Sequence, residues 1–554
     1  MPTQENPVNA PVLCRFVSSL EKIMPGKAPF LFVSQLRGCR NERFSVQLAC
    51  YYQESRPSSF MELSLTGGLS EYCRVYDVGL VSAGLPSYGD ADESELLFTA
   101  PTLVPDVMRP LEKGVRLLPH QWRSFWITID PAGKLPAGSY SLTACLRDSK
   151  GEWNEKAELM LTLEEQLLPK SPLLYTNWFH ADCLASYYHK EMLSEEHWKL
   201  LESYLSSAAY SGINLILTPI FTPPLDTEVG GERPTMQLVD VTCADGGYRF
   251  GYSLFDRWVS LCKKYGIENF EISHLFTQWG AHNAPKIMAH KNGKLTRIFG
   301  WETDAHGEEY SRFLRAFLPD FAAHLKKSGL AGHVWFHISD EPSLSHLESY
   351  TSAVNLVREC LPDFPIFDAL SNVDFYNTGA VKTPVVATNH AQSFYDSGVT
   401  GVWLYYCCSQ YKKVANRFLS TPPVRNRILG VQLYLAGAPG FLHWGYNFWY
   451  SQFSRRLIDP YSNTDADGGF PSGDGFVVYP GPDGIPYSCT RMEVFYDALQ
   501  DYRLLCLAEQ KLGRETVEKL LQRGLPQPIT LETCPVEAGW FDQWHAALYE
   551  LLND

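Results

Sequence analysis

The first 165 residues show short segments in which apolar and polar residues alternate. These segments run over residues 44–52, 61–66, 123–129 and 139–146, and the turns between them are rich in glycine and proline, as in residues 130–138. Alternation with a period of two places successive side chains on opposite faces of a strand. Regular short strands separated by such turns are typical of packed antiparallel sheets, so we predict an antiparallel β-sandwich over residues 1–166.

After a linker near residues 167–172, short apolar runs alternate with segments of helical periodicity. Helical stripes have apolar residues three or four positions apart, as at 198–208, 310–325, 347–361 and 491–511. Eight strands alternating with helices predict a TIM-type (β/α)8 barrel over residues 173–515, followed by a helical tail over residues 516–554. The candidate strands are residues 173–178, 214–218, 269–275, 333–338, 365–369, 385–388, 402–406 and 441–444.

The ends of these helices carry local signals. Ser194 precedes the first stripe as an N-cap, and Gly212 and Gly329 follow two of the stripes, where glycine commonly ends a helix. Ser345 and Glu348 have the spacing of a capping box at the start of the third stripe. The chain is therefore expected to be multidomain, with a mixed α and β second part, as a length of 554 residues also suggests.

Composition and charge exclude several classes of protein. Hydrophobic residues make up 45% and charged residues 20% of the chain, the balance of a globular protein. The formal net charge is -15 and no basic stripe is present, so we expect no nucleic-acid partner. Residues 428–450 carry no charge, but Gly437, Pro439 and Gly440 interrupt them, so we expect no membrane span.

Targeting and cysteine usage point to a reducing compartment. The segment from Met1 to Pro7 lacks the basic and apolar regions of a secretory signal, which predicts a cytoplasmic protein. Fourteen cysteines are scattered along the chain, with one adjacent pair at Cys407 and Cys408, and we expect them to be reduced. Because no HExxH motif, CxxC pair or close histidine cluster occurs, we predict neither a metal nor a cofactor.

The richest chemistry stands at the end of the fourth candidate strand, which reads His337-Ile-Ser-Asp-Glu-Pro342. In a barrel of this kind the active site lies at the carboxyl ends of the strands, so Asp340 and Glu341 are candidate catalytic residues. The simpler alternative is that one of these carboxylates caps the helix that follows.

The adjacency of the two carboxylates restricts the reaction. Neighbouring residues are poorly placed on opposite sides of a sugar ring, where a separate acid and nucleophile would stand. They suit a substrate that supplies its own nucleophile, such as the carbonyl oxygen of a 2-acetamido group, with one carboxyl protonating the leaving oxygen and its neighbour orienting the acetamido N–H. The conventional alternative needs a carboxylate at the end of the seventh strand, and Trp403-Leu-Tyr-Tyr-Cys-Cys-Ser-Gln410 contains none.

Aromatic and polar residues at the other strand ends are candidates for contacts with a sugar. Aromatic rings stack on the C–H faces of sugars and polar groups bind hydroxyls, although most such residues in a large protein belong to the core. The candidates are Thr218, His274, Gln278, Trp279, Asn389, Trp403, Tyr405, Trp444 and Asn447.

Several segments together resemble glycoside hydrolase family 123 and the wider group that shares its C-terminal barrel half. The likeness spans roughly residues 170 to 510, and its most specific part is the last segment with the motifs that follow it. The segments are residues 177–183, 214–226, 274–281, 338–342, 441–447 and 473–481, followed by Arg491-Met-Glu493 and Asp501-Tyr502.

The resemblance implies a β-N-acetylgalactosaminidase that removes terminal sugars with retention of configuration, by substrate-assisted catalysis. The family's Asp-Glu pair falls on Asp340, which would orient the acetamido group, and on Glu341, which would be the general acid/base. The implied partner is a glycan that ends in an N-acetylhexosamine. Two alternatives stay open: a conventional two-carboxylate barrel glycosidase acting on another sugar, and a carbohydrate-binding protein without catalysis.

Overall fold

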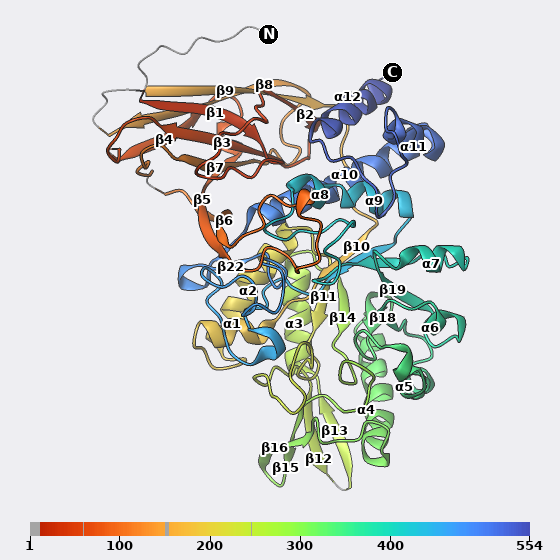
Figure 1. Ribbon diagram of the computed structural model, residues 1–554. Coiled ribbons are helices and arrows are strands. Elements are labelled where there is room, and N and C mark those ends of the chain that lie inside the picture. Colours follow the sequence, from red (N-terminus) through yellow and green to blue (C-terminus); the bar gives the residue numbers. More distant parts are fainter. Residues whose placement is uncertain (1–10, 59, 113, 150–153, 245, 554) are drawn as a thin grey trace. The chain divides into compact units, whose positions relative to one another are not determined.

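The computed structural model describes residues 11–58, 60–112, 114–149, 154–244 and 246–553 (Figure 1). The chain divides into two compact units, and each unit contains more than one segment of the chain. The first comprises Met1–Ser171, Ala415–Leu435 and Tyr487–Asp554, and the second comprises Pro172–Val414 and Ala436–Pro486. This division differs from consecutive domains with boundaries near 170 and 515, because two later segments join the N-terminal strands in the first unit.

The first unit contains two β-sheets with one apolar core. Phe125 and Ile127 of one sheet and Leu142 and Leu161 of the other belong to the same buried cluster. One sheet has the strand order β1 (Val12–Ser18), β3 (Phe44–Tyr52), β7 (Trp122–Ile129), β5 (Cys73–Ala83), β6 (Thr102–Pro110). The other sheet has the strand order β2 (Gln35–Cys39), β9 (Asn154–Glu164), β8 (Gly138–Asp148), β4 (Met61–Thr66). The pairings are antiparallel except that β2 runs parallel to β9, so the expectation of wholly antiparallel sheets is wrong at this strand.

Five helices complete the first unit. They are α8 (Pro423–Arg427), α9 (Leu429–Ala436), α10 (Thr490–Leu512), α11 (Arg514–Gln522) and α12 (Gly539–Asn553). A side chain on Gly430 of α9 would meet the carbonyl oxygen of Ala498 on α10 at 1.9 Å, so glycine allows these two backbones to touch. Arg427 also pairs with the buried Asp501 of α10 at 2.8 Å. These contacts explain why the segment 415–435 associates with α10 rather than with the barrel strands beside it in sequence.

The second unit contains a parallel sheet of eight strands that comes close to a closed barrel. All eight candidate strands are present, and they follow the order β17-β14-β11-β10-β21-β20-β19-β18. A parallel bridge between Phe336 and Ile366 joins the two outermost strands. The strands are β10 (Leu174–Asn177), β11 (Leu215–Thr218), β14 (Asn269–Ile272), β17 (Val334–Phe336), β18 (Phe367–Leu370), β19 (Thr383–Ala387), β20 (Trp403–Tyr405) and β21 (Gly440–His443).

Helices alternate with these strands along the chain, as the period of 3.6 residues predicts. They are α1 (Ala181–Tyr187), α2 (Glu195–Tyr210), α3 (Ser253–Lys264), α4 (Glu308–Lys327), α5 (Leu347–Cys360), α6 (Asp374–Asn377) and α7 (Ala391–Asp396). A separate four-stranded sheet, seen near α4 in Figure 1, consists of β13 (Gly247–Gly251), β12 (Asp240–Ala244), β15 (Ile287–Lys291) and β16 (Lys294–Phe299). Tyr248 of β13 packs edge-on against Phe313 of α4, with ring centroids 5.0 Å apart.

The predicted helix caps are partly confirmed. The hydroxyl of Ser194 accepts a hydrogen bond from the amide of His197 at 3.2 Å, which confirms the N-cap of α2. The predicted capping box of Ser345 and Glu348 is wrong, because a turn of 3-10 helix precedes α5 and its box joins Ser343 and His346. The helical turn starts directly after Pro342, earlier than the apolar stripe alone indicates.

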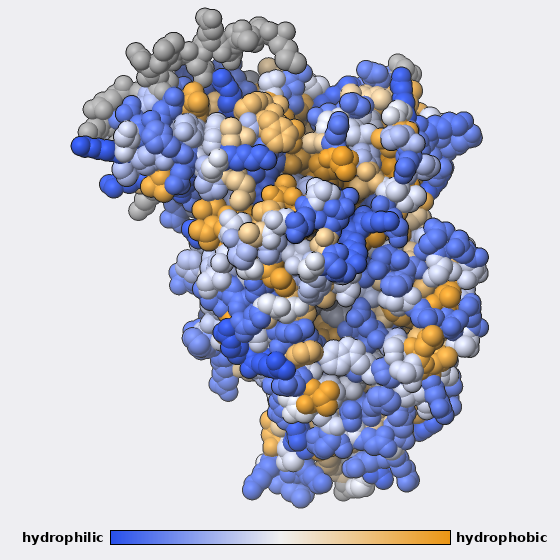
Figure 2. Space-filling view, viewed as in Figure 1, coloured by the Kyte–Doolittle hydropathy of each residue, from blue (hydrophilic) through white to orange (hydrophobic). Residues whose placement is uncertain are grey.

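The surface shows no extended apolar stretch on the face drawn in Figure 2, where hydrophobic residues form small groups among hydrophilic ones. Within the part of the chain that the structure describes, none of the helices has the length and apolar character needed to cross a bilayer. All fourteen cysteines carry free thiols.

Candidate active site

A cavity of about 290 Å³ in the second unit brings together residues that follow several barrel strands. Trp178 follows β10, Asp226 follows β11, Asp340 and Glu341 follow β17, Tyr405 ends β20, and all of them line this cavity. Residues beyond the carboxyl ends of parallel strands meet at one end of a barrel, which is why segments so distant in sequence converge here. A volume of this size accommodates a small polar ligand such as one sugar ring.

Asp340 and Glu341 face the same cavity because the strand alternation is broken between them. β17 ends at Phe336, and Glu341 has a φ of 43°, in the left-handed region that non-glycine residues rarely adopt. Hydrogen bonds from the amide of Trp279 to the carbonyl of Asp340 (3.1 Å) and from the amide of Glu341 to the carbonyl of Ala369 (3.2 Å) hold this turn. Asp340 and Glu341 therefore line the same cavity despite being neighbours in sequence.

Left-handed backbone is concentrated around the cavity. Asp226 (φ 38°), Trp279 (φ 60°) and Phe453 (φ 60°) line it together with Glu341, and none of them is glycine. Such conformations cost about 1–3 kcal/mol each and persist where the surrounding structure enforces them, most often at functional sites.

The two carboxyls behave as a pair. Burial raises the pKa of Asp340 well above its usual range, and the charge of Glu341 raises it further. Burial also raises the pKa of Glu341, while a hydrogen bond from the Tyr405 hydroxyl to Glu341 Oε1 (2.5 Å) acts in the opposite direction. Solvent still reaches Glu341 through the cavity. The two carboxyls consequently titrate as a coupled pair, and both pKa values are raised.

A third carboxyl, that of Asp226, lies in the same cavity. Its Oδ2 accepts a hydrogen bond from the amide of Phe453 at 2.9 Å, and its own amide donates to the side chain of Gln278 at 2.7 Å. Burial raises the pKa of Asp226 to about 6. The sequence analysis did not single out Asp226, although it stands at the end of the quoted segment 214–226, directly after Pro223-Pro224-Leu225.

Aromatic side chains form much of the cavity wall. The indole of Trp178 is fixed by a hydrogen bond from Nε1 to Glu271 (2.6 Å), and that of Trp444 by one to Asp474 (2.8 Å). Trp279, with 38% of its surface exposed, stands edge-on to Phe453 with ring centroids 6.0 Å apart. Rings held in this way present flat apolar surfaces, the feature that sugar C–H faces bind.

Four of the nine predicted sugar-contacting residues line the cavity, namely Gln278, Trp279, Tyr405 and Trp444. The other five do not line it, and each has its own structural neighbours. Thr218 accepts from Trp258 Nε1 (3.2 Å), His274 stacks on His337, and exposed Asn389 accepts from Gln410 (2.9 Å). Trp403 packs on Phe367 in the barrel core, and Asn447 bonds both backbone groups of His180.

Besides Asp226, the sequence analysis missed cavity residues contributed by long loops and by neighbouring positions. They carry no motif of their own and become recognisable only when the fold brings them together. These residues are Trp178, Leu225, Ala369, Cys407, Cys408, Leu442, Gln452, Phe453 and Phe470.

A buried polar network lies beneath the cavity. His337 donates to Glu271 and, at 2.8 Å, to Asp368, and Glu271 also accepts from Trp178. Burial alone would lower the pKa of His337, but the two carboxylates raise it to about 9, so the imidazole is a cation at neutral pH. The network thus fixes the orientation of Trp178 at the cavity wall.

One group of ligand atoms in the described part of the chain has the spacing of a metal site, that of His274, His337 and Asp368. The two imidazole rings are stacked, with centroids 4.2 Å apart and planes 20° from parallel. Ring lone pairs lie in the plane of each imidazole, so stacked rings do not direct them at one ion. Both nitrogens of His337 are moreover engaged by carboxylates, and the donor set does not fit a metal.

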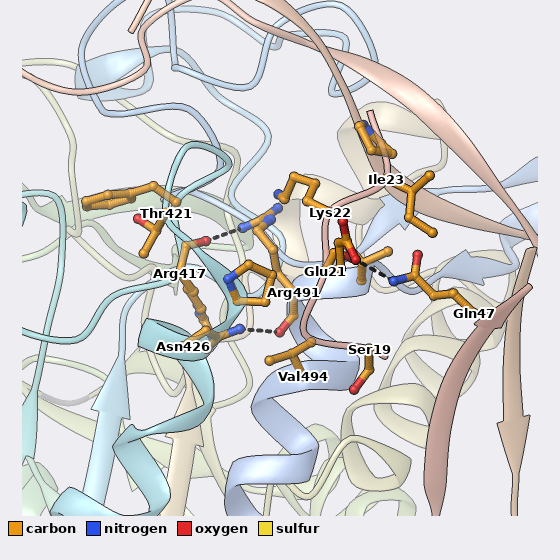
Figure 3. A pocket seen from close by; sticks show the side chains of 14 residues that line it. Ser19, Glu21, Lys22, Ile23, Gln47, Arg417, Thr421, Asn426, Arg491 and Val494 are labelled. Carbon is orange, nitrogen blue, oxygen red and sulfur yellow. Dashed lines mark hydrogen bonds between the residues drawn. The ribbon is translucent and has the colours of Figure 1, made fainter. Parts of the chain in front are cut away.

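A second cavity lies within the first unit and is much smaller (Figure 3). Its volume of about 20 Å³ holds about one water molecule. Hydrogen bonds from Arg491 to the carbonyl of Arg417 (3.2 Å) and from Asn426 to the carbonyl of Arg491 (2.7 Å) cross its wall. It is too small for a sugar. A further cavity of about 270 Å³, lined by Arg315 and Glu359 among others, is large enough but contains neither Asp340 nor Glu341. The barrel cavity is therefore the candidate active site.

A parallel barrel whose cavity contains paired carboxyls and aromatic walls is typical of glycoside hydrolases. The family model described as the catalytic domain of glycoside hydrolase 123 matches residues 178–508, and the chain belongs to this family. A search of curated proteins found no match.

A solved structure of another glycoside hydrolase shows the same fold. A family 123 glycoside hydrolase from Clostridium perfringens, described for glycolipid glycan hydrolysis, shares 16% identity, with 98% of each chain covered and a TM-score of 0.75. Two further structures match with far lower TM-scores. A termite-gut GH10 xylanase has 10% identity, 85% and 99% coverage and a TM-score of 0.33. A β-glucuronidase from Parabacteroides merdae has 12% identity, 89% and 52% coverage and a TM-score of 0.32.

Proposed function

We propose that the protein is a retaining exo-glycosidase that removes terminal β-linked N-acetylgalactosamine by substrate-assisted catalysis. The observation that carries the proposal is the placement of adjacent Asp340 and Glu341 in one cavity. Membership of a glycoside hydrolase family supports the reaction class.

In this mechanism Glu341, in its protonated form, transfers its proton to the glycosidic oxygen. The carbonyl oxygen of the 2-acetamido group attacks the anomeric carbon as the bond to the leaving group breaks. Asp340, as carboxylate, accepts the acetamido N–H and stabilises the positive charge of the oxazolinium intermediate. Glu341 then removes a proton from water, which attacks from the face that the leaving group occupied, so the configuration is retained.

The cavity wall suits this reaction. Tyr405 bonds Glu341 and fixes the direction of its carboxyl, while Trp178 and Trp444 offer locked ring surfaces for the sugar. The end of β20, where many barrel glycosidases carry a nucleophilic glutamate, reads Tyr405-Tyr-Cys-Cys408 and supplies no carboxylate. In the proposed mechanism the acetamido oxygen of the substrate takes the place of that glutamate as nucleophile.

One observation favours a second candidate mechanism, the conventional two-carboxylate glycosidase on another sugar. Asp226 lines the cavity and is a carboxyl from a different strand end than Glu341. Its pKa of about 6 leaves Asp226 mostly ionised at neutral pH, so its carboxylate could act as a nucleophile or accept a hydrogen bond from a sugar hydroxyl.

The test is the hydrolysis of a panel of nitrophenyl β-glycosides of N-acetylgalactosamine, N-acetylglucosamine, galactose and glucose. We expect turnover of the N-acetylgalactosaminide and almost none of the galactoside. Faster turnover of sugars without an acetamido group would favour the conventional mechanism. Absence of turnover with all four, together with sugar binding, would make the protein a carbohydrate-binding protein.

A further inference from the structure

Two adjacent thiols line the candidate active site. Cys407 and Cys408 follow β20 directly and both contribute to the wall of the barrel cavity. Cys407 is buried except toward the cavity, with 9% of its surface exposed, and Cys408 is half-buried. A ligand that enters the cavity is therefore surrounded in part by these two residues.

The two cysteines are neighbours in sequence and line the same cavity. The adjacent Cys408 thiol, together with burial, raises the pKa of the Cys407 thiol well above its usual range. The side-chain oxygen of Gln410 accepts from the Cys407 amide (2.9 Å) and thiol (3.2 Å), which holds the turn. Glu341 is close enough for its charge to act on Cys407. Both cysteines consequently lie in the same cavity as Glu341, a catalytic candidate.

The chain contains one further thiol contact that serves as an internal comparison. Cys14 and Cys50 lie 3.3 Å apart, but both are buried in the core between the two sheets of the first unit, with 4% and 0% exposure. Of these two pairs, only that at 407 and 408 opens into a cavity.

We propose that Cys407 and Cys408 form a dithiol site that binds trivalent arsenicals and thereby closes the active-site cavity. Thiolate sulfur is a soft ligand that prefers thiophilic elements over oxygen donors. In the reaction, the two As–O bonds of C6H5As(OH)2 are replaced by two As–S bonds, and each thiol proton leaves with a hydroxide as water. Arsenic stays trivalent. The second bond forms within one molecule, so the chelate is held far more tightly than a single thiol adduct.

The test treats the full-length protein with phenylarsine oxide and measures intact mass, the modified peptide and glycoside hydrolysis. We expect one phenylarsenic group per chain on the peptide that contains Cys407 and Cys408, and loss of most of the hydrolytic activity. A dithiol such as dimercaptopropanol should restore the activity, whereas an equal excess of a monothiol should not. The mass measurement does not depend on the proposed function, so failure of that function is recognised separately.

Cysteine substitutions identify the residues that bind arsenic. Cys408→Ser should lose the monothiol-resistant adduct, whereas Cys50→Ser, which breaks the other thiol pair, should retain it. Melting temperature verifies that each variant is folded. An adduct that is absent or lies on another peptide overturns the dithiol site. An adduct on this peptide with undiminished hydrolysis overturns the claim that it closes the cavity.

Discussion

Replacing Tyr405 with phenylalanine tests how the cavity sets the protonation of the general acid. The Tyr405 hydroxyl donates to Glu341 Oε1 at 2.5 Å and stabilises the ionised carboxylate. The hydrogen bond lowers the pKa of Glu341, against the raising effect of burial. Without the hydroxyl, the ionised form loses a donor, so the pKa of the pair's proton rises.

The size of the shift follows from the kind of bond. A hydrogen bond to a charged group contributes about 1.5–3 kcal/mol, and solvent access to Glu341 places this one near the lower end. Since one pKa unit corresponds to about 1.4 kcal/mol, we expect a shift of about one unit. A general acid works while it is protonated, so the alkaline limb of the rate profile should move to higher pH.

The assay is the pH dependence of kcat/KM with a substrate whose leaving group needs protonation. Tyr406→Phe is the matched control, because Tyr406 is the next residue, is fully buried and does not line the cavity. Its alkaline limb should stay in place. An alkaline limb that is unmoved in Tyr405→Phe, or that moves to lower pH, would refute this account of Glu341.

Other substitutions probe the same site and its support. Glu341→Gln should lower kcat by about two to four orders of magnitude on poor leaving groups and much less on activated ones; equal losses on both exclude its role as acid. Asp340→Asn should lower kcat for the acetamido substrate, because an amide cannot supply the charge that stabilises the oxazolinium ion; an unchanged kcat would contradict this. The pKa of His337 is about 9 in the folded protein, above its unfolded value of about 6.5. Protonated His337 therefore stabilises the folded state by about 3 kcal/mol below about pH 6.5, and this contribution is lost as pH rises through 9. In denaturant unfolding, the free energy of unfolding of the wild type should exceed that of His337→Gln by less at pH 9.5 than at pH 6.5. An equal difference at the two pH values would refute this role of His337.

The barrel strands could be predicted because buried parallel strands are nearly continuous apolar runs bounded by amphipathic helices. The inserted sheet could not, since its strands are short and largely exposed. β16, for example, begins with Lys294 and carries Leu295 with 59% of its surface exposed. The grouping of α9 and α10 in the first unit also depends on a backbone contact at Gly430 that no local pattern encodes.

A place at a strand end did not by itself decide which candidates reach the cavity. Thr218 ends β11 and does not line it, whereas Gln278 and Trp279 follow β14 by several residues and do.

Tyr405 and Trp403 share one face of β20 and one buried cluster. Trp403 lies two residues earlier, about 7 Å deeper along the strand, and does not line the cavity. The sequence does not define exactly where a strand ends, so it does not show how deep in the barrel a given side chain lies. Phe453 and Phe470 were unpredictable for a different reason, because long loops bring them to the cavity from segments that follow β21.

The identity of the nucleophile is the central claim, and one paired experiment tests it most directly. The protein is incubated with a thiazoline analogue of N-acetylgalactosamine, and separately with a 2-fluoro sugar that carries an activated leaving group. If the acetamido oxygen is the nucleophile, the thiazoline inhibits strongly, as a mimic of the cyclised intermediate, and mass spectrometry finds no glycosylated protein. A covalent glycosyl adduct on Asp226 or another carboxyl, with no inhibition by the thiazoline, would contradict the account by moving the nucleophile from the substrate to the protein.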